Sequence, residues 1–162
     1  MEFHNYRVSG PQWKALIDAS GDNIQWLLDL GVKFAMVSSP GKGEKTWHVY
    51  DGFGDALFDQ HFLPKAEELG VEILLNTPGK ELVMEDGRIV GVKATTPDKK
   101  ELLIKCKAAI IATGGFSDDP ELVAELTTDD MSQVVNGGTP GHTGDGIKMA
   151  RAVGAASNGY IQ

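Results

Sequence analysis

The stretch of sequence that decides the fold is Lys107-Ala-Ala-Ile-Ile-Ala-Thr-Gly-Gly-Phe116. Its apolar run, Ala108–Ala112, is short and unbroken, which is typical of a strand covered on both faces of a sheet. Gly114 and Gly115 then remove side chains where the strand ends, so another backbone or a ligand can approach closely. Ligands of open α/β sheets bind outside the carboxyl ends of the strands, which makes Thr113-Gly114-Gly115 a candidate binding edge. A plain strand exit with a tight turn is an equal alternative.

The composition is that of an ordinary globular domain. The 162 residues are 41% hydrophobic and 23% charged, and the formal net charge of −8 argues against non-specific nucleic-acid binding. No apolar run approaches the roughly 20 residues that a membrane span needs. Cys106 is the single cysteine, and the four histidines show no metal-ligand spacing, so no metal site is expected. Residues 1–7 lack the apolar core of a signal peptide, which makes a cytoplasmic location the default expectation.

Helices dominate the predicted first half. Three helices are expected before residue 70, over Pro11–Ser20, Asp22–Leu30 and about Asp55–Leu69. Gly31 ends the second helix as a C′ glycine would, and Pro64 is expected to kink the third helix or shift its start. A short strand is expected over Val32–Val37, followed by a polar loop over Ser38–Asp51.

Strands dominate the predicted second half. Five are expected, over Val71–Leu75, Lys80–Glu85, Arg88–Thr95, Glu101–Cys106 and Ala108–Ala112. Asp86-Gly87 is a two-residue hairpin signal, so the middle three strands should form an antiparallel meander. Two helices are expected to follow, over Asp118–Leu126 and Thr143–Gly154.

A glycine loop, Gly141-His-Thr-Gly-Asp-Gly146, opens the last helix. The loop is not suited to phosphate, because the carboxylate of Asp145 would occupy the positive helix end that a phosphate needs. The chain also lacks a Gly-x-Gly-x-x-Gly or Walker A pattern. Asp145 suits hydrogen bonds from hydroxyls, such as a ribityl or ribose group, or from backbone amides as a helix cap. Its spacing favours the cap.

No catalytic group can be assigned from the residues. The carboxylate pairs Asp118-Asp119 and Asp129-Asp130 are expected at helix caps or in exposed loops. His61 should lie on a helix in a packing or solvated position, and His142 lies in the glycine loop. No serine or cysteine stands in a setting typical of a nucleophile.

Four segments together resemble the flavoprotein family that includes succinate dehydrogenase, soluble fumarate reductase, urocanate reductase and ketosteroid dehydrogenases. They are Trp26–Phe34, Gly70–Thr77 with the meander through Asp86–Val92, Lys107–Phe116 and Thr143–Ala155. Their order and spacing extend over nearly the whole chain. The resemblance implies an α/β fold, namely a partial Rossmann-like FAD-binding domain with parallel strands, a three-stranded antiparallel meander and flanking helices.

The resemblance also implies FAD as the cofactor. By position, Thr113, Gly114 and Gly115 would lie beside it, Asp145 would hydrogen-bond to it, and the backbone near Gly79 would edge the adenine. Most relatives carry a valine-like residue at the position of Gly79. In the family, flavin N5 passes a hydride to an alkene next to a carboxylate or carbonyl, and an arginine supplies the proton.

Two features of the family are missing from the sequence. One is the first strand with its Gly-x-Gly-x-x-Gly turn, which grips the pyrophosphate. The other is the His-Pro-Thr motif that follows the segment matching Tyr160–Gln162 and opens the substrate-clamping domain. We therefore expect residues 1–162 to be a single partial FAD-binding domain, an internal piece of a cytoplasmic or periplasmic flavoprotein. The chain alone is expected to be inactive, and its binding of FAD is in doubt because the phosphate grip is missing.

The missing strands have a structural consequence. In the family sheet, the strands matching Val71–Leu75 and Ala108–Ala112 are separated by two N-terminal strands that this chain lacks. A chain folding alone must close that gap, leave open edges or pair with another copy. The remainder of the flavoprotein is thus one expected partner, and a second copy of the chain is another.

Two other interpretations stay open. The parent could be a different two-dinucleotide-binding flavoprotein, such as a relative of aspartate oxidase or of the disulfide reductases. The chain could also be a non-catalytic α/β module that binds a partner or nothing at all.

Overall fold

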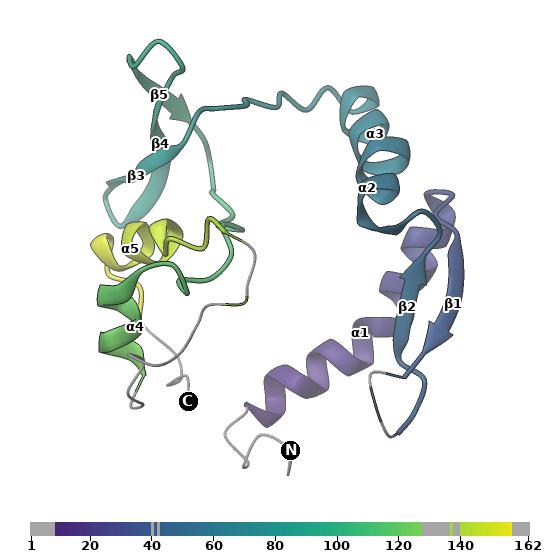
Figure 1. The fold of residues 1–162 in the computed structure, drawn as a ribbon. Helices are drawn as coiled ribbons and strands as arrows, with labels where there is room; N and C mark the ends of the chain where they lie inside the picture. Colours follow the sequence, from purple (N-terminus) through teal and green to yellow (C-terminus); the bar gives the residue numbers. More distant parts are fainter. Residues whose placement is uncertain (1–8, 40, 42, 128–136, 138–139, 157–162) are drawn as a thin grey trace. The chain divides into compact units, whose positions relative to one another are not determined.

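The computed structural model describes residues 9–39, 41, 43–127, 137 and 140–156. Asp129 and Asp130 lie outside the described residues. The chain divides into two compact units, Met1–Ile73 and Leu74–Gln162. Together they form a mixed α/β fold that contains a three-stranded antiparallel sheet with flanking helices (Figure 1). No helix among the described residues is long and apolar enough to cross a membrane.

The first unit begins with one long helix, α1 (Gly10–Asp29), where two were predicted. The prediction of a break was wrong because Gly21 keeps an ordinary helical backbone, at a conformational cost that a 20-residue helix absorbs. The end of α1 is as predicted. Gly31 has a φ of 85°, and its N–H donates to Leu28 O at 2.9 Å, while Val32 N–H donates to Leu27 O at 3.0 Å. This pair of bonds satisfies the last carbonyls of the helix.

A two-stranded antiparallel sheet follows α1. It pairs β1 (Phe34–Ser38) with β2 (Trp47–Tyr50). The first strand was predicted, but the second falls in a segment that was expected to be all loop. Aromatic pairing explains the difference, since the Phe34 ring lies 5.3 Å from that of His48 and 5.5 Å from that of Tyr50. Such cross-strand pairs stabilise a hairpin whose polar residues would otherwise favour a loop.

The predicted third helix is present but irregular. It runs as α2 (Phe53–Leu57), a π-helical turn (η2, Phe58–Phe62) and α3 (Leu63–Glu68). Pro64 lies in the first turn of α3, where its missing N–H costs no helical hydrogen bond, and the wide turn directly precedes it. His61 has the predicted packing role, because its Nδ1 lies 3.2 Å from Leu30 O at the end of α1.

The second unit contains the predicted meander. It comprises β3 (Gly79–Glu85), β4 (Arg88–Thr95) and β5 (Glu101–Lys105), paired antiparallel in that order. Asp86 and Gly87 form the predicted tight turn, both with positive φ. Two helices follow, α4 (Pro120–Leu126) and α5 (Asp145–Ala152). Figure 1 shows α5 beside β3 and next to α4.

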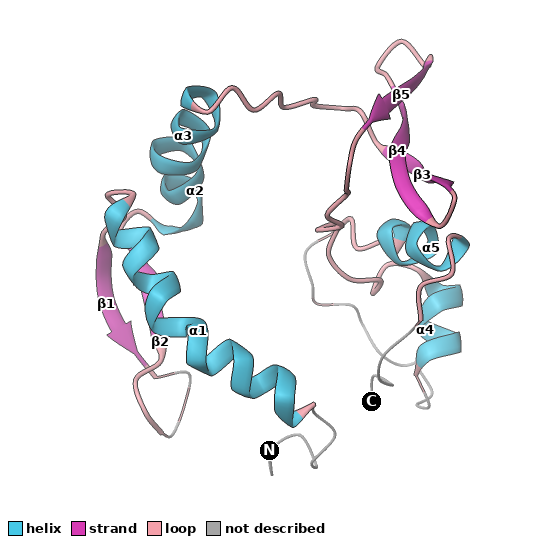
Figure 2. Cartoon of the chain, turned by 180° about the vertical axis from the view of Figure 1, so that it is seen from behind, coloured by secondary structure: helices cyan, strands magenta, loops and turns pink. Residues whose placement is uncertain are grey.

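The two segments expected as buried parallel strands, Val71–Leu75 and Ala108–Ala112, are not strands in the structure. Figure 2 draws both as loop, and Ile110 is 95% exposed. The prediction was wrong for a physical reason. A parallel strand needs a neighbour for its backbone hydrogen bonds, and the described residues contain only antiparallel pairs. Local sequence makes these segments extended, but it cannot supply the missing neighbours.

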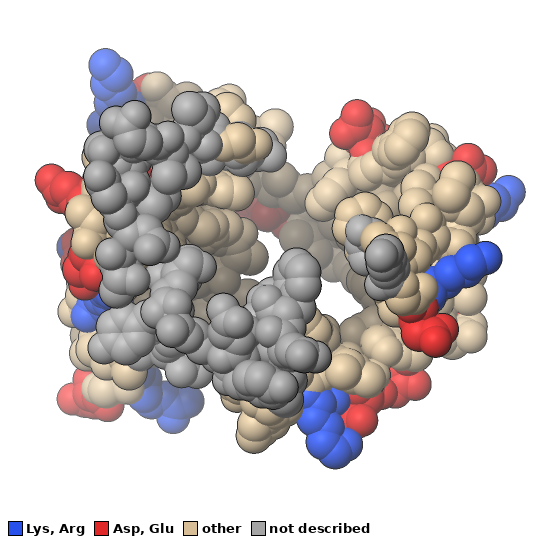
Figure 3. Space-filling model, turned by 60° about the horizontal axis from the view of Figure 1, so that its bottom comes forward, with Lys and Arg blue, Asp and Glu red and all other residues tan. Residues whose placement is uncertain are grey.

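The hydrophobic core is small. Among the described residues, five apolar side chains are buried, and none of them lies in α1. Many large apolar side chains of the described residues remain exposed, among them Leu69, Leu75 and Ile110. Figure 3 shows acidic and basic side chains interspersed on the visible face.

Two glycine substitutions test the continuity of α1. Gly21 and Gly70 are both exposed, with nothing within 4 Å of an added Cβ, and they differ in that Gly70 has a φ of 71°. We expect Gly21→Ala to raise the free energy of unfolding by about 0.5–1 kcal/mol. Gly70→Ala should lower it by about 1–2 kcal/mol, because an L side chain is strained at that φ. Urea unfolding followed by circular dichroism measures both, and equal destabilisation by the two variants would argue for a break at Gly21.

Candidate functional site

The candidate site lies in the second unit, where the segment after β5 meets the start of α5. The backbone N–H of Gly144 donates to Gly115 O at 3.1 Å, which joins the predicted binding edge to the glycine loop. Gly146 is buried, and a Cβ there would collide with the side chains of Thr113 and Ile111. Thr113-Gly114-Gly115 and Asp145 are therefore brought together, although thirty residues separate them in the sequence.

A second glycine, Gly144, allows the glycine loop to lie close to α4. Gly144 precedes α5 with a φ of 69°, which favours glycine. A Cβ at this position would collide with the side chain of Leu122, which is 4% exposed in α4. The loop, α4 and α5 thus converge on positions where only glycine leaves enough room.

Asp118 and His142 form a contact that the sequence analysis missed. The Oδ2 atom of Asp118 accepts hydrogen bonds from the backbone N–H of Gly141 at 2.6 Å and of His142 at 3.0 Å. In return, the Asp118 N–H donates to His142 O at 3.0 Å. The sequence predicted a helix-cap or loop role for the Asp118-Asp119 pair. It gave no sign that Asp118 would bond to Gly141, which lies 23 residues away.

Asp119 is a helix cap, as predicted. Its Oδ1 accepts hydrogen bonds from Glu121 N and Leu122 N, both at 3.0 Å, and its side chain also forms an ion pair with Lys148 of α5. The Lys148 ammonium, helped by these backbone bonds, lowers the pKa of the Asp119 carboxyl below its usual value. The same partner raises the pKa of Lys148. Together with the Arg151–Glu125 pair at 3.0 Å, this contact ties α5 to α4.

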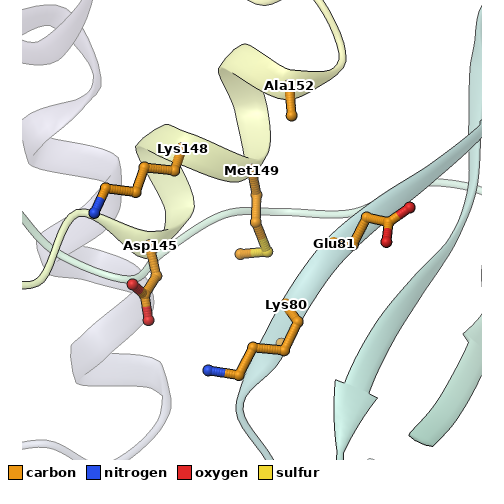
Figure 4. A pocket seen from close by; sticks show the side chains of 7 residues that line it. Lys80, Glu81, Asp145, Lys148, Met149 and Ala152 are labelled. Atoms are coloured by element: carbon orange, nitrogen blue, oxygen red, sulfur yellow. The ribbon is translucent and has the colours of Figure 1, made fainter.

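A cavity of about 300 Å³ lies between α5 and β3 (Figure 4). It is lined by Gly79, Lys80, Glu81, Asp145, Lys148, Met149 and Ala152. Two of the predicted site residues, Gly79 and Asp145, therefore share one cavity. In Figure 4 the Met149 side chain extends from α5 toward β3, whereas the Glu81 carboxylate points away from the helix. The floor is apolar, and polar groups stand at its edge.

Asp145 is not the helix cap that its spacing favoured. Gly144 takes the cap position without a side-chain hydrogen bond, and Asp145 is the first residue of α5. Its carboxylate is exposed and accepts no hydrogen bond from the described residues. The second possibility, an acceptor for hydroxyl groups, stays a prediction.

An acidic hollow adjoins the cavity. Its volume is about 370 Å³, and it is lined by Asp118, Asp119, Pro120, Glu121, Thr143, Asp145 and Lys148. Four carboxylates face one ammonium, and that ammonium is already paired with Asp119. An anion would be repelled here, in agreement with the prediction that the loop does not bind phosphate. Within the described part of the chain, no cluster of three candidate metal ligands occurs.

Comparisons with known proteins agree on a family. The sequence model of the FAD binding domain family matches residues 5–161. Vinyl phenol reductase of Lactiplantibacillus plantarum is 35% identical over 161 residues, which cover 98% of this chain and 33% of that protein. Fumarate reductase (cytochrome) of Shewanella frigidimarina is 28% identical over 156 residues, which cover 92% of this chain and 27% of that protein. The chain thus spans one third or less of the length of these relatives.

A solved structure shares the fold. It is the crystal structure of 3-ketosteroid-delta4-(5alpha)-dehydrogenase from Rhodococcus jostii RHA1 in complex with 4-androstene-3,17-dione. The TM-score is 0.70 at 23% sequence identity, and the match covers 86% of this chain and 36% of the dehydrogenase. At this level of identity the likeness concerns the fold alone.

The contact of Gly146 with Ile111 and Thr113 can be tested by adding one methyl group. We expect Gly146→Ala to lower the free energy of unfolding by about 1–3 kcal/mol, because the added Cβ has no room. Gly115→Ala is the matched control, since its Cβ would lie an ordinary 3.9 Å from His142 Nδ1. Its effect should stay within about 0.5 kcal/mol. Equal stability of the two variants in urea titrations would contradict the close packing.

Proposed function

The chain belongs to the FAD binding domain family, and from this premise we propose that it is the cofactor-holding part of a flavin oxidoreductase that reduces or forms a carbon–carbon double bond next to a carboxylate or carbonyl. One observation carries the proposal. Residues distant in sequence, namely Gly79, Thr113–Gly115 and Asp145, gather around the first turn of α5. The names of the relatives, a vinyl phenol reductase and a fumarate reductase, both support reduction of a carbon–carbon double bond. Only the fumarate reductase supports a bond next to a carboxylate, because the vinyl group of a vinyl phenol adjoins an aromatic ring.

The residues around the cavity fit the uncharged parts of FAD. Gly79 presents backbone, and Met149 and Ala152 offer an apolar surface, which suits a planar adenine ring. A Cβ at Gly79 would lie 3.5 Å from Val92 Cγ1 and 4.0 Å from Met149 Cε, an ordinary packing distance. The exposed carboxylate of Asp145 can accept hydrogen bonds from hydroxyl groups.

The cavity is too small for the whole cofactor. Its volume of about 300 Å³ is at the lower end of the range of about 300–1,000 Å³ that ligand pockets occupy. When bound, FAD supplies the hydride transfer. The contribution of this chain is to bind and orient: Gly79 and Met149 would hold one end, and Thr113 with Gly114 would border the cofactor at the glycine edge. We assign no catalytic residue to the chain.

We propose that the remainder of a larger flavoprotein completes the site. The chain spans one third of the length of vinyl phenol reductase, and its sequence contains no phosphate-gripping glycine turn. The exposed apolar side chains and the unpaired segments, 71–75 and 108–112, support the same proposal. Residues 1–162 would then form one partial FAD-binding domain, and the missing strands would pair with these segments.

The chain expressed by itself should therefore associate. We expect multi-angle light scattering to give a mass above the 17.4 kDa of one copy, because exposed extended segments pair with other strands. Amide hydrogens of residues 71–75 and 108–112 should be protected in the associated form. A monomer would contradict this expectation. Protection of both segments in that monomer would mean a rearranged sheet within one copy, and lack of protection would mean that the edges stay open.

Asp145 provides the direct test of cofactor binding. In the protein made from its complete gene, we expect Asp145→Ala to weaken FAD binding by about 10- to 100-fold, because a hydrogen bond to a charged acceptor contributes about 1.5–3 kcal/mol. Quenching of flavin fluorescence on titration measures the dissociation constant.

The matched control is Asp98→Ala, which removes a carboxylate from the turn between β4 and β5. Asp98 is bonded to Thr96 and Lys100 rather than to the site. Its loss should leave FAD affinity within about twofold of wild type, well below one tenfold step. Complete protein that takes up no FAD would overturn the proposed function. Unchanged affinity in the Asp145→Ala variant would remove this residue from the site.

A further inference from the structure

We propose that Asp118 is a positioning residue of the cofactor site, because its carboxylate holds the Gly141–His142 turn and thereby places the His142 ring against Gly114. The proposal rests on the proposed function, since Gly114 borders the cofactor only if the chain binds FAD. The role falls to a residue that does not line the cavity between α5 and β3.

Three hydrogen bonds make the Asp118 contact specific. Two run from the backbone of Gly141 and His142 to one carboxylate oxygen, at 2.6 and 3.0 Å, and one returns from the Asp118 N–H to His142 O at 3.0 Å. Gly141 has a φ of 105°, so the turn adopts a conformation that favours glycine. The carboxylate satisfies two adjacent N–H groups that such a turn would otherwise leave to solvent.

The held turn brings His142 onto the binding edge. A Cβ added to Gly114 would lie 3.1 Å from Cδ2 and 3.3 Å from Nε2 of the His142 ring, and one added to Gly115 would lie 3.9 Å from Nδ1. The imidazole therefore lies beside both glycines. The ring is half-buried and offers a donor and an acceptor beside the place proposed for FAD.

The neighbouring carboxylates of Asp118 and Asp119 have different partners. Asp119 is buried, caps α4 and pairs with Lys148, so it holds the two helices together. Asp118 is exposed, and its carboxylate accepts hydrogen bonds from the backbone of the Gly141–His142 turn. Loss of Asp118 should therefore release the turn and the His142 ring while the helices stay packed. A positioning role predicts a change in FAD binding that is larger than the change in stability.

The test uses the protein from its complete gene. We expect Asp118→Ala to weaken FAD binding at least tenfold in fluorescence titrations, while the thermal midpoint of the apo-protein shifts by no more than that of Asp98→Ala. Asp118→Asn keeps an acceptor oxygen and should recover FAD affinity to within about threefold of wild type, because that oxygen can still accept both turn N–H groups. The visible circular dichroism of bound flavin should change in Asp118→Ala and return toward wild type in Asp118→Asn.

A double-mutant cycle with His142→Ala examines the proposed route. Because Asp118 acts through His142, the double variant should bind FAD about as weakly as the weaker single variant. Fully additive losses would overturn the proposal, and so would a loss of affinity that merely follows a loss of stability. Wild-type affinity in Asp118→Ala would overturn this inference alone. Wild-type protein without FAD would overturn the proposed function and this inference together.

Discussion

The second unit depends on one close contact, between the first turn of α5 and the extended segment that ends at Thr113. Gly146 has no room for a Cβ against Ile111 and Thr113, so the helix backbone lies directly on that segment. This contact determines where Asp145 stands, and the bond from Gly144 N to Gly115 O continues it along the loop. The first turn of α5 also lines the cavity beside β3, through Asp145 and Lys148. Interiors this tightly packed respond to a single methyl group.

Backbone hydrogen bonding sets the second constraint. The segments 71–75 and 108–112 are mostly apolar and belong to no helix or strand, and residues such as Ile110 remain exposed. Burial would remove their apolar side chains from water, but it would also require partners for their N–H and C=O groups. An antiparallel hairpin finds such partners within a few residues, as β3 and β4 do, whereas a parallel strand must obtain them from distant sequence. The meander is therefore formed, and the two parallel segments are not.

The same distinction explains how far the sequence could be interpreted. Asp86-Gly87 and the Asp119 cap are local signals, and the structure contains both features as predicted. The predicted strand over Ala108–Ala112 would need neighbouring strands, which the described residues do not provide. The hairpin strand β2 depends on aromatic pairs with Phe34. Neither outcome could be predicted from the local sequence pattern. At the site, the glycine-rich edge and Asp145 could be singled out by position. The link from Asp118 to His142 could not, because hydrogen bonds across 24 residues leave no periodic trace.

Charge decides which part of a dinucleotide this chain can hold. The hollow at the start of α5 is lined by Asp118, Asp119, Glu121 and Asp145, and Lys148 is neutralised by its pair with Asp119. The positive helix end is thus surrounded by carboxylates, so a pyrophosphate would meet repulsion where a helix normally attracts it. Hydroxyl groups and an uncharged ring meet acceptors and apolar surface instead. In the proposed function, the cofactor would therefore approach this unit with its uncharged groups, and its phosphates would require donors from another segment of polypeptide.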